Sequence, residues 1–407
     1  MPETTHAPMT ASPQGAGRRP PSWLERQQDR LRIVMSTAWA VRAQTGKGAL
    51  AQLREILALR VRRVGPREYY RYRLFDDDRF TPAEKREFTG YRFEAAVYRT
   101  VNDPGLMATS GMSGTWDGKI DKVLFDSFMR AADVPTPKIL AIYDTAGPEY
   151  YGVPVLRTVG ELESFFRSHG ASGFFAKPAR AHSWTGALSV PLVQGEQAHL
   201  ADGATCSLSR LASLVAEQSR VVIQERLVPH LVLAELSGPT VATLRVVVLR
   251  RDEASEIHRV VLRIPIGSNI VDNFDAGRNG NLIGWVDPEE GKLVRVYSGW
   301  GLDQQRMAQH PDSGKAFDGL VLPDWEQAMS IVHRASRVLV GMPFQSWDLA
   351  LTSRGPVMIE VNDVSGQNIL QLAGPPGLLD RRLCDFLRER GLRWPYPHPA
   401  SHAPDSH

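Results

Sequence analysis

Apolar residues recur at intervals of three and four positions near the start of the chain. Residues 49–64, ALAQLREILALRVRRV, carry leucine and isoleucine at this spacing with charged residues between them, which predicts an amphipathic helix. A second helix start is predicted at Thr81, because this hydroxyl cap is followed by Pro82 in the first turn and by Glu84 three places on. Residues 23–98 are therefore predicted to form a helical N-terminal region.

Beyond residue 117, short apolar runs alternate with amphipathic segments, which predicts a mixture of strands and helices. Helices are predicted over residues 121–133, 208–218 and 324–338. Strands are predicted where β-branched and aromatic residues gather between turn residues, at 138–143, 172–178, 221–227, 241–250, 256–265, 281–286, 292–297, 346–352 and 356–362. The chain is thus expected to be an α+β protein with mixed sheets.

Composition narrows the class of protein. With 407 residues, of which 43% are hydrophobic and 23% charged, the chain can bury a large core and is typical of a globular protein. Its two cysteines, Cys206 and Cys384, lie far apart, which argues against a disulfide framework and predicts a reducing, cytoplasmic setting. No apolar run has the length of a membrane span. Residues 1–22 lack the apolar segment of a signal peptide and are predicted to be a disordered tail.

The nearly balanced charge argues against a nucleic-acid partner, because the net charge is only +3. Arginines are nevertheless frequent between Arg26 and Arg73. A solvated helical face is the simpler interpretation of this run. The alternative is a peripheral membrane contact with anionic lipid, or a contact with an acidic partner, through these basic N-terminal helices.

Two acids stand among apolar strand residues near the C-terminal end of the chain. The segments SWDLALT and PVMIEVN are predicted to form a hairpin. If Thr352 faces Pro356 across its turn, then Asp348 lies directly opposite Glu360. Two carboxylates paired in this way have Cβ atoms about 5 Å apart and repel each other. They therefore require a shared proton or a cation.

A magnesium ion would satisfy this pair of acids. Strand alternation places Met358, Glu360 and Asn362 on one face, so the amide oxygen of Asn362 would add a neutral ligand beside the carboxylates. Mg²⁺ prefers oxygen ligands at about 2.1 Å and commonly takes phosphate oxygens as well, as in nucleotide sites. The ordinary alternative is that Glu360 ends an edge strand in solvent and pairs with an arginine.

Four basic residues are candidates for binding phosphate. Lys177 ends the apolar strand GFFA and Lys122 opens a helix; both would emerge at element ends, as ordinary surface lysines also do. Arg245 and Arg263 lie inside aliphatic strands, and a buried arginine usually has an anionic partner. That partner is either a carboxylate of the hairpin or a phosphate.

The order of these motifs resembles the ATP-grasp superfamily, most closely its sugar-transfer-associated branch and more distantly the ribosomal-protein glutamate ligases. The resemblance spans about residues 116–370 and rests on DK at 121–122, AKP at 176–178, QERL at 224–227, TLR at 243–245, LR at 262–263, DN at 272–273, WDLAL at 347–351 and MIEVN at 358–362. It implies an ATP-grasp fold, in which two α+β subdomains clasp ATP.

The resemblance also implies roles by position. It assigns the ATP phosphates to Lys122 and Lys177, the adenine-binding hinge to Gln224, Glu225 and Leu227, the magnesium ligands to Asp348, Glu360 and Asn362, and the phosphate and acyl-phosphate contacts to Arg245, Arg263 and Asn273. His230, just past the hinge, is a candidate for contact with ribose or substrate.

Four further residues are candidates for substrate contact: His182, His310, Ser365 and Gln367. His182 lies in the loop PARAHSWTG, where many relatives have several glycines, so a glycine flap over the γ-phosphate is in doubt; packing is the alternative role. Turn formation alone explains the residues around His310. Ser365 and Gln367 follow the hairpin and offer polar groups near the expected phosphates.

The implied organisation divides the chain into six parts. These are a disordered tail over 1–22, a helical N-terminal region over 23–98, a pre-ATP-grasp region over 99–172, a small subdomain over 173–230, a large subdomain with the magnesium site over 231–395 and a flexible tail over 396–407.

The expected activity is ATP-dependent ligation of a carboxylate to an amine through an acyl phosphate, with ATP and Mg²⁺ as cofactors. The acid would be a small molecule or a peptide. Two alternatives remain open: a phosphotransferase that phosphorylates a small molecule, and a nucleotide-binding scaffold without turnover. The chain has no G-x-S-x-G motif, which agrees with a reaction that needs no protein nucleophile.

Overall fold

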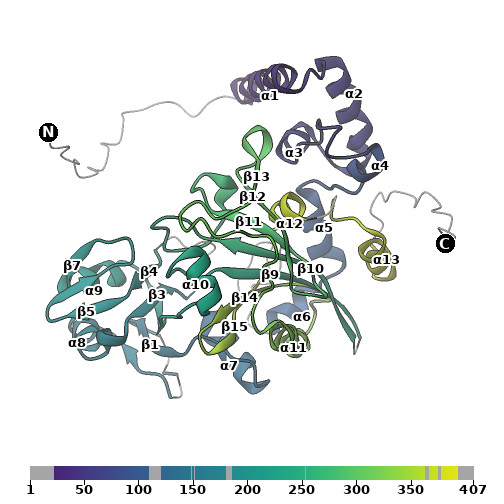
Figure 1. Cartoon of the computed structure of the whole chain (residues 1–407). Helices are drawn as coiled ribbons and strands as arrows, with labels where there is room; N and C mark the ends of the chain where they lie inside the picture. Colours follow the sequence, from purple (N-terminus) through teal and green to yellow (C-terminus); the bar gives the residue numbers. More distant parts are fainter. Residues whose placement is uncertain are drawn as a thin grey trace, which may run out of the picture. The chain divides into compact units, whose positions relative to one another are not determined.

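The computed structural model describes residues 23–109, 121–147, 149–150, 152–179, 186–252, 254–362, 366–374 and 377–392 (Figure 1). The chain divides into two compact units, residues 1–53 and 54–407. Within the part of the chain described, no helix combines the length and the apolar character needed to cross a membrane.

Helices dominate the N-terminal region, as predicted. They are α1 (Trp23–Thr45), α2 (Ala49–Leu59), the 3-10 turn η1 (Arg60–Arg62), α3 (Pro66–Arg71), α4 (Pro82–Lys85), α5 (Arg92–Thr100) and α6 (Pro104–Thr109). The predicted capping box at Thr81 is confirmed: its hydroxyl accepts a hydrogen bond from the Glu84 amide at 3.3 Å, and the Glu84 carboxylate accepts one from the Thr81 amide at 2.7 Å. The helix that this box begins is a single turn.

A five-stranded sheet with strand order β2-β1-β8-β3-β4 forms the smaller sheet layer. Its strands are β1 (Ile139–Asp144), β2 (Val155–Leu156), β3 (Phe174–Pro178), β4 (Leu188–Val190) and β8 (Arg220–Glu225). Around it lie α7 (Lys122–Ala131), α8 (Val159–His169), η2 (Gly170–Ser172), α9 (Leu208–Ala216) and a three-stranded sheet of β5 (Leu192–Gln194), β6 (Gln197–His199) and β7 (Thr205–Ser207). Because β1 pairs with β8, the boundary predicted at residue 172 cuts through one sheet.

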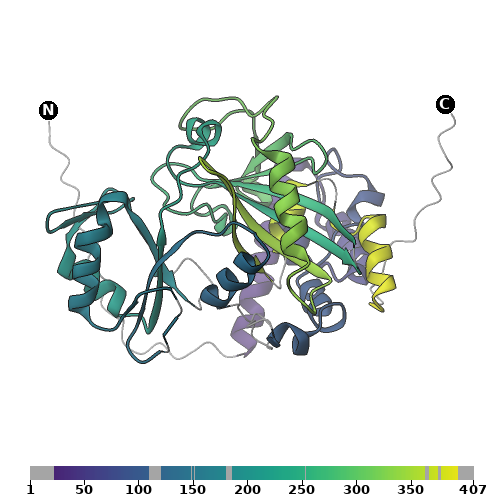
Figure 2. The same cartoon turned by 90° about the horizontal axis from the view of Figure 1, so that it is seen from below.

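An antiparallel seven-stranded sheet, ordered β13-β12-β11-β10-β9-β14-β15, forms the larger layer. Its strands are β9 (Thr243–Arg251), β10 (Ala254–Ile264), β11 (Leu282–Val286), β12 (Leu293–Ser298), β13 (Gln305–Met307), β14 (Phe344–Thr352) and β15 (Gly355–Asn362). The remaining elements are α10 (Leu231–Ser237), η3 (Asp275–Gly277), η4 (Gly301–Asp303), α11 (Trp325–Ser336), α12 (Gln367–Ala373) and α13 (Arg381–Glu389). Figure 2 shows α11 lying across one face of this sheet.

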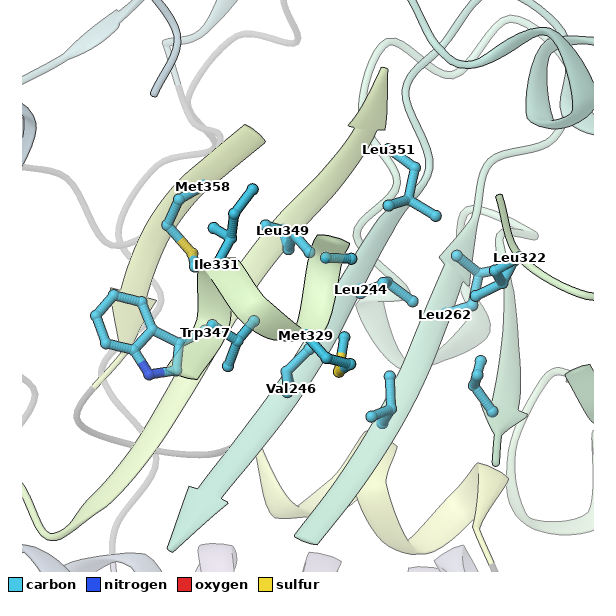
Figure 3. Packing of buried hydrophobic residues seen from close by; sticks show 14 of the residues in the cluster. Leu244, Val246, Leu262, Leu322, Met329, Ile331, Trp347, Leu349, Leu351 and Met358 are labelled. Atoms are coloured by element: carbon cyan, nitrogen blue, oxygen red, sulfur yellow. The ribbon is translucent and has the colours of Figure 1, made fainter. Parts of the chain in front are cut away.

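The main hydrophobic core lies between α11 and the large sheet (Figure 3). Leu244 and Val246 of β9 and Trp347 and Leu349 of β14 are fully buried there and pack with Met329 of α11. These residues alternate along their strands, so the residues between them point to the opposite face. Burial of each large apolar side chain contributes about 1.5–3 kcal/mol, which strongly favours one register of the strands.

The hairpin of β14 and β15 confirms the predicted pair and corrects the way it arises. Asp348 does lie opposite Glu360, but Thr352 pairs with Gly355 rather than with Pro356. A bulge between Asp348 and Leu349 then shifts the register by one residue and brings the two acids together.

The same bulge changes which residues share a face of β15. Met358 pairs with Leu349 and is fully buried in the main core. Glu360 and Asn362 pair with Asp348 and Ser346, which lie on the opposite face. The prediction that Met358 shares a face with Glu360 and Asn362 is therefore wrong, because strict alternation fails across a bulge.

Candidate functional site

A row of charged side chains crosses the large sheet on the face opposite α11. Arg245 of β9 pairs with Asp348 of β14, and Asp348 pairs with Glu360 of the edge strand β15. Alternation along these strands brings the three side chains to one face while their neighbours fill the core. The chemistry of the site therefore follows from the packing of the opposite face.

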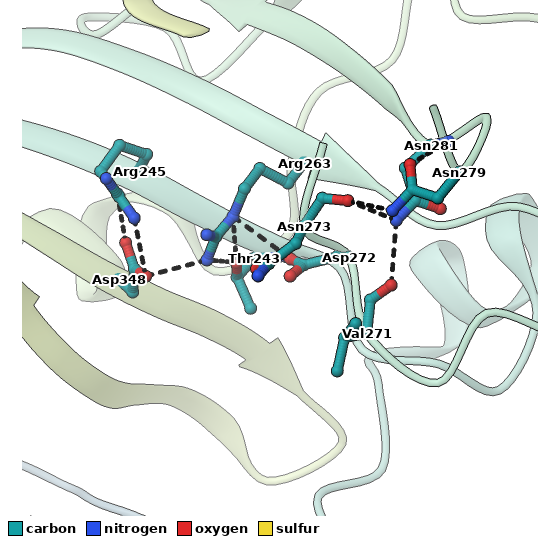
Figure 4. A network of polar contacts seen from close by, with 9 residues as sticks. All are labelled: Thr243, Arg245, Arg263, Val271, Asp272, Asn273, Asn279, Asn281 and Asp348. Atoms are coloured by element: carbon teal, nitrogen blue, oxygen red, sulfur yellow. Dashed lines mark hydrogen bonds and ion pairs between the residues drawn. The ribbon is translucent and has the colours of Figure 1, made fainter. Parts of the chain in front are cut away.

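Two guanidinium groups hold Asp348, as Figure 4 shows. Arg245 donates from Nε to Oδ1 and from Nη2 to Oδ2, the latter at 3.1 Å, and Arg263 Nη2 donates to Oδ2 at 2.9 Å. Asp348 is only 2% exposed. The sequence left open whether Arg245 and Arg263 pair with a carboxylate of the hairpin or with a phosphate. In the structure both pair with the carboxylate of Asp348.

Arg263 also belongs to a second cluster, which the sequence did not reveal. Its Nε donates to the Thr243 hydroxyl at 3.0 Å and lies 3.6 Å from an oxygen of Asp272. Asp272 in turn accepts hydrogen bonds from the Thr243 amide at 2.7 Å and from its hydroxyl at 2.5 Å. Thr243 lies two places before Arg245, so strand alternation alone would have placed it on the same face.

Burial and ion pairing compete in setting the protonation of these groups. Burial acts to raise the pKa of Asp348, but the neighbouring Arg245 and Arg263 outweigh it and lower that pKa below its usual value. Burial acts to lower the pKa of Arg263, but Asp272, Asp348 and Glu360 raise it overall. For Asp272, burial prevails over Arg263 and raises the pKa. Asp348 and Arg263 consequently stay charged at neutral pH.

Two lysines from the smaller sheet layer contribute positive charge near Glu360. Lys177 lies near the end of β3, and Lys122 is the first residue of α7. Burial lowers the pKa of Lys177 to about 8, helped by Lys122, while Glu360 and Asp348 oppose the shift. Burial also lowers the pKa of Lys122, against the influence of Glu360 and Asp121. Neither ammonium group has a hydrogen bond or ion pair with another residue that the structure describes.

The end of the hairpin holds polar atoms without partners. Ser346 and Asn362 pair across β14 and β15, and Ser346 Oγ and Asn362 Nδ2 are buried without a hydrogen-bond partner. Glu360 is half-buried and makes no ion pair with the residues described. The alternative considered from the sequence, a solvent-exposed Glu360 paired with an arginine, is therefore not found. Buried polar atoms are rarely left unpaired, so this group is suited to a polar ligand.

The donor set at this place fits a magnesium ion by chemical type. Asp348, Glu360 and Asn362 offer two carboxylates and an amide oxygen, which are the hard oxygen ligands that Mg²⁺ prefers. Among the described residues no group of three His, Cys, Asp or Glu side chains is suited to a metal, so an ion here would need ligand oxygens from outside the protein. Phosphate oxygens are the usual source in nucleotide sites.

The hinge segment after β8 is engaged within the protein. Glu225 accepts a hydrogen bond from the Lys138 amide at 2.8 Å and pairs with Arg354 in the β14–β15 turn. Gln224 is buried, with Nε2 at 3.5 Å from the Pro137 carbonyl. Leu227 is half-buried. His230 caps α10, since its Nδ1 accepts from the Val232 amide at 3.2 Å. Their expected contacts with adenine and ribose remain predictions.

The other predicted site residues differ in their surroundings. His310 is fully buried; Nε2 contacts the Pro265 carbonyl at 3.0 Å and Nδ1 accepts from the Asp312 amide at 3.3 Å, which argues against the expected contact with substrate. Gln367 begins α12. His182 and Ser365 lie outside the described residues.

Asn273 lies in a loop organised by two other asparagines. Its carbonyl oxygen accepts hydrogen bonds from Asn279 Nδ2 at 2.5 Å and Asn281 Nδ2 at 2.8 Å. Asn281 is fully buried. Its Nδ2 also donates to the Val271 carbonyl at 2.9 Å (Figure 4), and its Oδ1 accepts from the Ile266 amide at 3.1 Å. Asn281 could not be recognised from the sequence, because a single asparagine in a glycine-rich loop is an ordinary turn residue.

Several solved structures are similar to this chain at low sequence identity. The first of the similar solved structures is D-alanyl-alanine synthetase A from Vibrio cholerae O1 biovar eltor, with 14% identity, coverage of 72% of this chain and 68% of that chain, and a TM-score of 0.41. The VanG D-Ala:D-Ser ligase from Enterococcus faecalis is 13% identical, with coverage of 69% of this chain and 63% of that chain and a TM-score of 0.37. The L-amino acid ligase from Bacillus licheniformis is 12% identical, with coverage of 67% of this chain and 50% of that chain and a TM-score of 0.34. Likeness at this level says nothing of the reaction.

No curated protein matches the chain. The sequence model of the sugar-transfer associated ATP-grasp family, however, matches residues 119–385. That range contains both lysines, the hinge and the charged row of the large sheet. It includes well over half of the 407 residues. The chain therefore belongs to the sugar-transfer-associated ATP-grasp family and has the ATP-grasp fold.

Proposed function

We propose that this protein is an ATP-dependent carboxylate–amine ligase that forms an amide bond through an acyl phosphate. One observation carries the proposal: the ammonium groups of Lys122 and Lys177 have no hydrogen-bond or ion-pair partner among the described residues, and Glu360 acts to raise the pKa of both. Ammonium groups without partners beside carboxylates suit a ligand that carries phosphates and a divalent cation.

The roles of the residues follow from their charge and position. Asp348, Glu360 and Asn362 would hold Mg²⁺, which when bound supplies positive charge to offset the charge of the phosphates. Lys122 and Lys177 would bind the phosphate oxygens, while the hinge and His230 would contact the nucleoside. Arg245, Arg263 and Asn273 would orient the acid and its acyl phosphate.

The proposed reaction has two steps. A carboxylate oxygen of the acid attacks the γ-phosphorus of ATP, the bond to the β–γ bridging oxygen breaks, and ADP leaves. The amine nitrogen then attacks the acyl carbon, phosphate leaves with the C–O bonding electrons, and the nitrogen loses a proton. Lys177 and Arg263 would stabilise the phosphoryl group in the first step by fixed positive charge.

The phosphotransferase alternative differs in its products. A ligase releases ADP and free phosphate only when acid and amine are both present, whereas a kinase retains the phosphoryl group on its product. The scaffold alternative predicts no turnover at all. Two opposed carboxylates at the centre of the site favour turnover, since a docking protein has no need to hold them together.

Trapping the acyl phosphate tests the proposal. The protein would be incubated with ATP, Mg²⁺, hydroxylamine and pools of carboxylic acids; attack of hydroxylamine on an acyl phosphate yields a hydroxamate. Glu360→Gln should lower the rate of hydroxamate and ADP formation by about 100-fold or more. Glu326→Gln, which changes an exposed acid on α11, is the matched control and should behave like the unmodified protein.

Two outcomes would refute the ligase. One is ADP formation that is unchanged in Glu360→Gln. The other is the absence of any heat in calorimetry with Mg²⁺ and ATP, because the proposed site must bind this pair before any acid is activated.

A further inference from the structure

The start of α12 lies against the charged row of the large sheet. Gly366, the residue before the helix, has φ of +66°, and a Cβ added to it would lie 2.9 Å from Nη1 of Arg245. This is the guanidinium that holds Asp348. Any larger residue at position 366 would be strained by its backbone conformation and crowded by Arg245.

The N-terminal region fixes this end of α12 with three hydrogen bonds. A carboxylate oxygen of Glu94 accepts from the Gln367 amide at 2.7 Å. Oδ1 of Asn368 accepts from Arg71 Nη1 at 2.8 Å and from the Tyr72 hydroxyl at 2.7 Å. Two separate elements, α3 with the residue that follows it and α5, thus attach to two consecutive residues.

The orientation of Arg71 is itself constrained. Its guanidinium lies over the ring of Trp300, 4.3 Å from the ring centre. Stacking on an aromatic ring restricts a long side chain that would otherwise lose considerable rotamer entropy on making one hydrogen bond. The contact between Arg71 and Asn368 is therefore held from two sides.

Further contacts hold the rest of α12. The Thr89 amide donates to Gln371 Oε1 at 2.9 Å, and Gln371 Nε2 donates to the Thr89 carbonyl at 3.1 Å. The buried Arg259 donates from Nη1 to the carbonyls of Leu370 at 3.3 Å and Gly377 at 2.6 Å. A seven-residue helix is too short to be stable alone, so its position depends on these contacts.

One polar atom at the start of α12 has no hydrogen-bond partner among the residues that the structure describes. Gln367 is 1% exposed, and its side-chain Oε1 is buried without a hydrogen-bond partner. A carbonyl oxygen of this kind accepts from N–H or O–H groups. Leaving it unpaired costs free energy in the unliganded protein, so the atom is suited to a ligand that donates a hydrogen bond.

We propose that the N-terminal segment of residues 66–94 positions one side of the substrate site. Glu94, Arg71 and Tyr72 are positioning residues that set α12 against Arg245, and Gln367 Oε1 accepts a hydrogen bond from an N–H or O–H group of the acid substrate. The inference rests on the proposed ligase function. It assigns substrate selection partly to a segment that precedes residues 119–385, the range shared with the family.

The tether is tested first without any substrate. Asn368→Ala removes the acceptor of Arg71 and Tyr72, whereas Asn368→Asp keeps an oxygen at that place. Hydrogen exchange of the amides of residues 367–373 should be accelerated on the order of ten-fold in Asn368→Ala and should return close to the original rate in Asn368→Asp. Exchange in α11 serves as the internal control, because a general loss of stability would change it too.

The same pair of variants then separates substrate positioning from nucleotide binding. With an acid found by hydroxamate trapping, Asn368→Ala should raise the half-saturating acid concentration about ten-fold. In Asn368→Asp this concentration should return close to that of the unmodified protein. The Kd of Mg-ATP should stay within about two-fold in both variants. Glu94→Ala and Glu94→Gln form a second pair. Glu94→Ala removes the acceptor of the Gln367 amide and should lose acid affinity, whereas Glu94→Gln keeps an acceptor oxygen and should retain it.

Each outcome decides the inference. Unchanged exchange of residues 367–373 in both alanine variants would overturn the tether, and a loss of Mg-ATP affinity equal to the loss of acid affinity would overturn the assignment to the acid. If no acid gives a hydroxamate even in the unmodified protein, the ligase proposal fails, whereas the exchange rates still decide whether the N-terminal segment positions α12.

Discussion

At the scale of single residues, the site is defined by how charges are distributed between partners. Asp348 is shared by two guanidiniums, whereas Lys122 and Lys177 have no ion-pair partner among the residues described. Burying a charge without a partner is costly, and burial accordingly lowers the pKa of both lysines. Binding of an anion would reverse this shift.

Proton uptake on binding of Mg-ATP is the expected result. The pKa of Lys177 is about 8, so at pH 8 about half of the molecules would gain a proton when a phosphate arrives. Calorimetry in buffers of different ionisation enthalpy measures this uptake. It should disappear in Lys177→Met and persist in Lys138→Met, which changes an exposed lysine. A binding heat that does not depend on the buffer would contradict the prediction.

The same residue affects stability with a defined sign. The pKa of Lys177 in the folded protein, about 8, lies below the value of about 10.4 for an unfolded lysine. Between these two values the unfolded chain binds more protons, so this group makes folding more favourable as the pH rises from about 8 toward 10.4. Below pH 8 its contribution is unfavourable and constant.

At the scale of elements, the hairpin shows what can be inferred from pattern. Alternation predicted both strands, and an assumed turn with Thr352 opposite Pro356 predicted the pairing of Asp348 with Glu360. The pairing is correct because the bulge offsets the shorter turn, in which Thr352 pairs with Gly355. The bulge was not predictable, since no residue in MIEVN marks it. Met358 was therefore assigned to the wrong face, although the acid pair was correct.

Substitution of Met358 distinguishes the two arrangements. Because this side chain is fully buried in the main core, Met358→Ala should lower the free energy of unfolding by about 2–5 kcal/mol while the Kd of Mg-ATP stays nearly unchanged. Denaturant unfolding and calorimetry measure the two effects. Ile359→Ala, at the half-buried neighbouring position, should cost less. A loss of nucleotide affinity without loss of stability would favour strict alternation instead.

Other elements carried too little signal to be predicted. Strands β4 to β7 are three residues each, which is too short for a period of two to be recognised. Helix α12 has seven residues and depends on Glu94, Arg71, Tyr72 and Arg259 for its position. Contacts between residues almost 300 positions apart cannot be read from local pattern. Thr243 and Asp272 lie in the motifs TLR and DN but were assigned no role, and Asn281 was missed because an asparagine in a glycine-rich loop is an ordinary turn residue.

At the scale of the whole molecule, the two large sheet layers meet at the hinge after β8. Glu225 ends β8, yet it binds the Lys138 amide and Arg354, which lies in the turn of the β14–β15 hairpin. Under the proposed function ATP binds between these layers, so the carboxylate would join two parts that hold a common ligand. Its side chain is consequently engaged at the place where the resemblance assigns adenine recognition.

Breaking the ion pair at the hinge should cost little stability. Arg354 is 47% exposed and Glu225 30% exposed in this pair, and exposed ion pairs contribute only about 0–1 kcal/mol. Arg354→Ala should therefore change the free energy of unfolding by less than about 1 kcal/mol. Glu225→Ala should cost more, because it also leaves the Lys138 amide unpaired. Equal costs for the two variants in denaturant unfolding would show that the amide contact is unimportant.

The bulge in the final hairpin marks a place where this protein can gain or lose a residue over evolution. Met358 pairs with Leu349 on the core side and Glu360 pairs with Asp348 on the opposite side, so Ile359 is the extra residue between them. Deletion of Ile359 alone would make Met358 and Glu360 neighbours that still point to opposite faces, and Glu360 would stay beside Asp348. Single-residue gaps in an alignment of this hairpin should therefore fall at this position and not between Glu360 and Asn362, where a deletion would turn Asn362 toward the apolar side.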